Sequence, residues 1–151
     1  MSNVAKNLKD SLKKFGLKEV SSPEGCHFFL FFCPITSRAG TDIEAAEIYL
    51  NEVNKAPKPV IMVVLHYTFD PEKIILDSNS AIKREDIFAV DCLYNDTGLL
   101  ACEKNTEAIS KIQVDSKLNR WTSYYCLKNH GNPCLPINLD ANDKGFNCPI
   151  L

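Results

Sequence analysis

Apolar residues recur along the chain with two patterns, one with the period of a helix and one running continuously as in a buried strand. Near the start, apolar residues are spaced four, four and three apart, which predicts a helix over residues 3–15 that ends at Gly16. Its apolar face is Val4, Leu8, Leu12 and Phe15. Similar spacing predicts helices over residues 42–53 and 105–118. The apolar stripe of the second is Ile43, Ala46, Ile48, Leu50 and Val53.

Three apolar segments, residues 26–33, 60–67 and 87–93, are typical of strands, and the first two are apolar on both alternating faces. A strand covered on both sides belongs inside a parallel sheet, and the order strand, helix, strand indicates a right-handed βαβ unit. A short helix is expected around residues 78–83 and a turn at 95–98. We therefore predict an α/β fold, a Rossmann-like or flavodoxin-like three-layer sandwich with a short, mainly parallel sheet.

From Trp121 onward no period is sustained, and the segment contains three prolines and two glycines. Such a tail either wraps the domain through its aromatic residues or stays mobile. The sequence predicts an α/β domain over residues 1–120 and an irregular C-terminal extension over residues 121–151.

Composition limits the classes of function. The 151 residues are 45% apolar, enough for the core of one domain, and the net charge of −2 leaves no basic excess for general nucleic-acid binding. The longest apolar run, residues 28–33, is far too short to cross a bilayer, and the first 15 residues carry charges throughout. We expect a cytoplasmic protein without membrane or nucleic-acid partners.

The seven cysteines form an odd set, and several lie inside strand-like segments. This usage is typical of reduced thiols in a reducing compartment, where buried cysteine acts as a small hydrophobe.

The loop after the first strand, "PITSRAGTD", lies where ligands of open parallel sheets bind. It offers hydroxyl groups, one arginine, one glycine that lets a ligand approach the backbone, and the N-terminus of the next helix. A histidine near the end of the second strand can face the same rim. The candidate residues for binding an anionic small molecule are Thr36, Ser37, Arg38, Gly40, Thr41 and His66.

A structural interpretation explains most of the same loop. Thr41 and Glu44 fit a capping box at a helix start, which needs no ligand. Asp42 and Glu44 would repel a phosphate, and the single Gly40 satisfies neither dinucleotide nor P-loop spacing. This interpretation is the preferred one, and the ligand site is the alternative.

No catalytic set is complete in the sequence. Cys33 and Arg38 are one residue too close for the C-x5-R loop of cysteine phosphatases, and Pro34 removes a donor from that loop, so core packing explains Cys33 better. For His66, a structural role among its neighbours is preferred to proton transfer, although Asp91 and Asp96 could form an acidic edge nearby.

Thiolates and an imidazole can bind zinc, and the candidate ligands are Cys126, His130, Cys134 and Cys148. Their spacing matches no familiar zinc motif, and the glycine and proline between them prevent one helix from presenting all four. We therefore predict no metal, no cofactor and no catalytic residues.

Four stretches of the chain resemble a family of small, multi-copy bony-fish (teleost) proteins. They are residues 16–20, 32–46 with "FCPITSRAGTDIEAA", 63–71 with "VVLHYTFDP", and 90–93. The likeness covers about residues 5–118 and carries no catalytic signature. It implies an immune or interferon-linked role.

The sequence thus favours a non-enzymatic cytoplasmic interaction module that acts through a protein partner or through self-association, in innate immune defence. The alternative is a protein, or an enzyme, that binds a small molecule or a nucleotide phosphate at residues 33–44.

Overall fold

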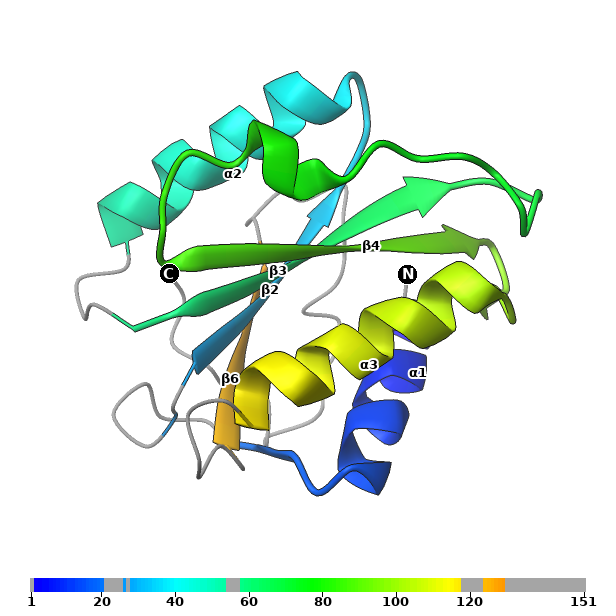
Figure 1. Ribbon diagram of the computed structural model, residues 1–151, viewed down its shortest axis with the longest axis horizontal. Helices are drawn as coiled ribbons and strands as arrows, with labels where there is room; N and C mark the ends of the chain where they lie inside the picture. Colours follow the sequence, from blue (N-terminus) through cyan, green and yellow to red (C-terminus); the bar gives the residue numbers. More distant parts are fainter. Residues whose placement is uncertain (1, 21–25, 27, 54–57, 118–123, 130–151) are drawn as a thin grey trace.

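The computed structural model describes residues 2–20, 26, 28–53, 58–117 and 124–129. Within them, one six-stranded sheet has the order β1-β6-β2-β3-β4-β5 (Figure 1). The first five strands in that order are parallel, and β5 is antiparallel to β4. The strands are β1 (Lys18–Glu19), β2 (Phe28–Pro34), β3 (Val60–Tyr67), β4 (Ile87–Asn95), β5 (Gly98–Leu99) and β6 (Tyr124–Asn129).

The three strands predicted from the sequence lie side by side and run the same way. β2 pairs with β3 from Phe29↔Val60 onward, and β3 pairs with β4 from Val60↔Ile87 onward. Every residue of β2 and the first seven of β3 are buried, as expected of central strands covered on both faces. The predicted α/β class with a mainly parallel sheet is confirmed.

Three α-helices and a short 3-10 helix cover the sheet in the described residues. They are α1 (Ser2–Lys14), α2 (Ala39–Val53), η2 (Ser78–Ala81) and α3 (Glu103–Lys117). Figure 1 shows α2 and η2 on one side of the strands and α1 and α3 on the other. Each α-helix buries a narrow apolar stripe, such as Leu8 and Leu12 in α1 and Ala108 and Ile112 in α3. None of the helices in these residues has the length and hydropathy of a membrane span.

Two residues assigned to apolar helix faces prove to be exposed. Phe15 lies beyond the end of α1, where Gly16 takes a φ of +87°, and its side chain is 40% exposed. Ile48 is 55% exposed because a helix of 3.6 residues per turn places it opposite the buried stripe of Ile43, Ala46 and Leu50. The side chain of Val53 lies outside the described residues.

The segment after residue 121 contributes a strand that the sequence analysis did not predict. β6 lies between β1 and β2, with Lys18↔Tyr124 on one side and a register from Phe28↔Tyr125 to Phe32↔Asn129 on the other. Residues 124–129 are therefore part of the sheet rather than of an irregular extension. The rest of the predicted extension, residues 130–151, lies outside the described residues.

Candidate functional site

The loop between β2 and α2 does not have the predicted capping box. α2 begins at Ala39, and the first helical hydrogen bond runs from the Asp42 amide to the Arg38 carbonyl at 2.9 Å. Gly40 and Thr41 thus lie inside the first turn, so Thr41 is not the N-cap residue. The prediction of a Thr41–Glu44 box is wrong because the helix starts earlier than the apolar stripe indicates.

The Asp42 side chain instead reaches back and holds the loop. Its Oδ2 accepts hydrogen bonds from the amides of Thr36 at 2.8 Å and Ser37 at 3.0 Å, and its Oδ1 accepts one from the Ser37 hydroxyl at 3.2 Å. Both amides belong to the loop that precedes α2, beside the free amides of the first helical turn that an anion would also use. A carboxylate of the chain already satisfies the two loop amides, so the geometry favours the structural interpretation of the loop, and anion binding there stays a prediction.

The cysteine at the end of β2 is not a reactive nucleophile. Burial, and then the negative charge of Asp42, raise the pKa of Cys33 to about 12. Burial, followed by the charge of Asp91, likewise raises the pKa of Cys92 to about 12. Nucleophilic cysteines need a lowered pKa, so both thiols act as core residues.

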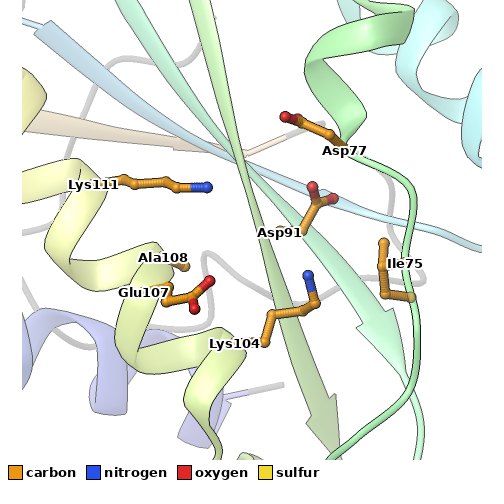
Figure 2. A pocket seen from close by; sticks show the side chains of 7 residues that line it. All are labelled: Ile75, Asp77, Asp91, Lys104, Glu107, Ala108 and Lys111. Atoms are coloured by element: carbon orange, nitrogen blue, oxygen red, sulfur yellow. The ribbon is translucent and has the colours of Figure 1, made fainter.

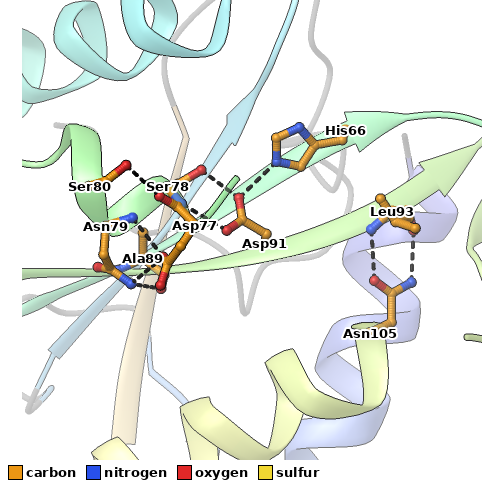
Figure 3. Close-up of polar contacts among 9 residues, drawn as sticks. All are labelled: His66, Asp77, Ser78, Asn79, Ser80, Ala89, Asp91, Leu93 and Asn105. Carbon is orange, nitrogen blue, oxygen red and sulfur yellow. Dashed lines mark hydrogen bonds and ion pairs between the residues drawn. The ribbon is translucent and has the colours of Figure 1, made fainter. Parts of the chain in front are cut away.

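His66 meets residues of β4 and η2. It is 8% exposed, and its Nε2 lies 2.8 Å from Oδ1 of Asp91 (Figure 3). The Ser78 hydroxyl donates to the same oxygen at 2.5 Å, and the Ser78 amide donates to Oδ2 at 3.0 Å. Burial alone would raise the pKa of Asp91, but the hydrogen bonds from His66 and Ser78 outweigh it and lower that pKa. The cluster joins β3, β4 and η2.

The order of these groups differs from a serine-hydrolase triad. In such a triad the imidazole lies between the serine and the carboxylate and takes the serine proton. Here the carboxylate of Asp91 lies between Ser78 and His66, so the Ser78 hydroxyl points at the acid and not at the base. The arrangement stabilises the fold locally and does not activate Ser78.

Two asparagines bind the backbone of β4. Asn79 accepts from the Ala89 amide and donates to the Ala89 carbonyl, both at 2.8 Å. Asn105 accepts from the Leu93 amide at 2.7 Å and donates to the Leu93 carbonyl at 2.8 Å. Each carboxamide therefore supplies the donor and the acceptor that a residue of a neighbouring strand would otherwise offer to β4. Sequence reasoning missed both asparagines and Ser78, because asparagine and serine are also the ordinary residues of turns and helix caps.

A small, largely polar pocket opens beside Asp91. It has a volume of about 80 Å³, room for several water molecules. Figure 2 shows the α3 side chains on one side of β4 and the segment before η2 on the other. The lining residues are Ile75, Asp77, Asp91, Lys104, Glu107, Ala108 and Lys111.

Large apolar side chains are exposed on the loop of residues 68–77, which follows β3 and is called here the 68–77 loop. Ile74 is 92% exposed, Leu76 87% and Phe69 67%. Tyr67, at the end of β3, packs edge-on against Phe69 and Tyr94, with ring centroids 5.6 and 5.4 Å apart. Single exposed apolar side chains are normal on a protein surface, but several within one loop are typical of an interaction site.

The candidate zinc ligands cannot be placed. The side chain of Cys126 and residues His130, Cys134 and Cys148 lie outside the described residues. Within the described part of the chain, no three His, Cys, Asp or Glu side chains are grouped so as to hold a metal ion.

Comparisons of the sequence and the fold give no match to a protein-family model, to a curated protein or to a solved structure.

Proposed function

We propose that the protein is a non-enzymatic, cytoplasmic interaction module of innate immune defence, built on a Rossmann-like three-layer fold, that binds a protein partner through the 68–77 loop. The exposure of Ile74, Leu76 and Phe69 is the observation that supports it. Burying an aliphatic or aromatic side chain of this size contributes about 1.5–3 kcal/mol, so three of them can anchor an interface. The defence role rests on the resemblance to the fish family.

The charges of the loop indicate the chemistry of the partner. The 68–77 loop contains three acidic residues and one basic residue: Asp70, Glu72, Asp77 and Lys73. A second copy would bring the same acidic surface against it, and like charges facing each other oppose binding. We therefore propose a different protein, one with an apolar surface surrounded by lysine and arginine, rather than self-association.

Among the described residues, Cys33, Cys92 and Ser78 show no activation as nucleophiles, which supports a role in binding rather than catalysis. In the described residues, the two fully buried cysteines with resolved shifts have raised pKa values, and the Ser78 hydroxyl donates to a carboxylate. The loop donors that an anionic substrate would use are engaged by Asp42. The exposed apolar loop is the feature that these structural roles leave unexplained.

Photocrosslinking in cells tests the proposal. A crosslinking amino acid at position 74 should capture a protein that is then purified and titrated against the wild-type chain. The combined change Phe69→Ser, Ile74→Ser and Leu76→Ser should weaken that binding by about tenfold or more. Ile48→Ser is the matched control, because Ile48 is also a large exposed aliphatic residue but lies on α2. It should leave the affinity unchanged.

Two results would overturn this function. One is a captured protein whose affinity is the same for the wild type and the triple variant. The other is capture of a second copy of the chain, together with a concentration-dependent dimer in sedimentation that the triple variant lacks. Raising the salt concentration should weaken the expected complex, because its acidic loop meets a basic rim.

A further inference from the structure

The backbone of β4 has one edge without a full neighbouring strand. The Val60 amide donates to the Asp86 carbonyl at 2.8 Å, and the Thr68 amide donates to the Tyr94 carbonyl at 2.9 Å. Backbone groups of a parallel strand point to its two sides at alternate residues. Even-numbered residues of β4 therefore bond to β3, while the backbone groups of Ala89, Asp91 and Leu93 point to the other edge.

Along this edge, Asp91 is the residue whose main-chain N–H and C=O stay unpaired within the described part of the chain. Asn79 pairs with the backbone of Ala89, and Asn105 pairs with that of Leu93 (Figure 3). A backbone donor and acceptor left together favour a partner that supplies both complementary groups.

The pocket lies at Asp91 and brings charges to it. Lys104, Glu107 and Lys111 of α3 line it, and none of them makes an ion pair within the described part of the chain. The carboxylates of Asp77 and Asp91 also line it, but they accept hydrogen bonds from Asn79 and from His66 and Ser78. The lining as a whole carries one net negative charge, so a small anion would be attracted only locally, at the α3 side, where Figure 2 shows the two lysine side chains directed toward β4.

We propose that this pocket binds a small molecule that joins a primary carboxamide to a carboxylate. The carboxamide would pair with the N–H and C=O of Asp91, as the carboxamides of Asn79 and Asn105 pair with the residues on either side. The carboxylate would then meet Lys104 and Lys111. A peptide strand does not fit this edge, because the two asparagines block the ladder at both neighbouring positions. Ile75 and Asp77 of the 68–77 loop also line this pocket, but the proposed ligand contacts use none of the exposed side chains Phe69, Ile74 and Leu76.

Three matched probes separate the two halves of the ligand. Succinamate has a carboxamide and a carboxylate, succinate lacks the carboxamide, and succinamide lacks the carboxylate. In two-dimensional amide NMR of the full chain, millimolar succinamate should shift the backbone amide of Asp91, and the other two should bind about tenfold more weakly or worse. Each good hydrogen bond or charge contact is worth about that factor.

Lysine variants test the charged half. Lys104→Gln with Lys111→Gln should weaken succinamate about tenfold while leaving succinamide unchanged. Lys13→Gln, in the last turn of α1, is the matched control and should change neither affinity. The NMR spectrum of each variant reports whether the fold is retained.

The proposal is wrong if succinamate leaves the Asp91 amide unshifted at millimolar concentration. It is also wrong if succinate binds as well as succinamate, since the lysines would then attract any anion. A loss of succinamate affinity in Lys13→Gln equal to that in the α3 variant would exclude the pocket as the site.

Discussion

Asp91 shows how much of the local structure depends on one side chain. Its two oxygens accept from His66, from the Ser78 hydroxyl and from the Ser78 amide, and so tie β3 and η2 to β4. Each of these donors would lose a partner if the carboxylate were removed. Because the acid is mostly buried, an unpaired donor there would cost about 1–3 kcal/mol.

Acid should weaken the protein partly through Asp91. Its pKa is lower in the folded chain than its ordinary value near 4, so the ionised form stabilises the fold at neutral pH. That contribution is complete above the ordinary value and is lost as the pH falls from about 4 through the folded value. Asp91→Asn should lower the free energy of unfolding at pH 7 by about 1–3 kcal/mol.

The same variant should lose less stability than the wild type between about pH 5 and pH 3, because it lacks the carboxylate whose protonation weakens the wild type. Urea unfolding at each pH measures both quantities. Asp10→Asn, an exposed change on α1, is the control and should follow the wild type at pH 7. If Asp91→Asn and the wild type lose equal stability in acid, the carboxylate does not have a lowered pKa.

At the scale of elements, two glycines occupy very different backbone positions. Gly98, in the β4–β5 hairpin, has a φ of +124°, and a Cβ there would collide with the side-chain oxygen of Asn7 on α1. Gly40, in the first turn of α2, has no atom within 4 Å of an added Cβ and no left-handed φ. Only the first position requires glycine.

The two alanine variants should therefore change stability in opposite directions. Gly98→Ala should cost at least about 1–2 kcal/mol, from the left-handed conformation and the contact with α1. Gly40→Ala should stabilise α2 by about 0.5–1 kcal/mol, because alanine loses less backbone entropy in a helix. Denaturant unfolding of both variants gives the comparison, and a destabilising Gly40→Ala would contradict a helical conformation of Gly40 in the first turn of α2.

The sequence predicts elements well where the signal is local. β2 and β3 are buried on both faces, so each appears as an unbroken apolar run, and α1 has a clear stripe that ends at a glycine. The start of α2 was misplaced because Asp42 caps the loop from inside the helix. An acidic residue in the first turn looks the same in a sequence whether it bonds backward or faces water.

The candidate site was only partly predictable for a different reason. His66 and Asp91 were each singled out, but their contact depends on the β3–β4 register, which places Val64 opposite Asp91 and His66 opposite Leu93. Side chains of paired residues in a parallel sheet share a face, so the two polar groups come together only after pairing. Nothing in the sequence marks Asn79 and Asn105 as partners of the β4 backbone, because asparagine is also common in turns and at helix ends.

For the whole molecule, the decisive element is the strand that the sequence did not reveal. β6 connects β1 to the rest of the sheet, since β1 pairs with β6 and β6 pairs with β2. Its segment "YYCLKN" has neither the unbroken apolar run of β2 nor a strict alternation. The position of a strand within a sheet is set by distant partners, and no local pattern reports it.

A proline in β6 tests whether this strand is central. Odd-numbered residues of β2 bond to β3, since the Phe29 amide donates to the Pro59 carbonyl, so even-numbered ones face β6. With Phe31↔Lys128 in register, the Lys128 amide points to β2.

Lys128→Pro removes that donor and places a proline where central strands exclude it. This change should lower the free energy of unfolding by about 3 kcal/mol or more, and it should broaden or abolish the cooperative thermal transition. Lys128→Val keeps the backbone amide and favours a strand, so this control should retain the cooperative transition. If the proline variant and the wild type have the same melting temperature, the sheet ends at β2.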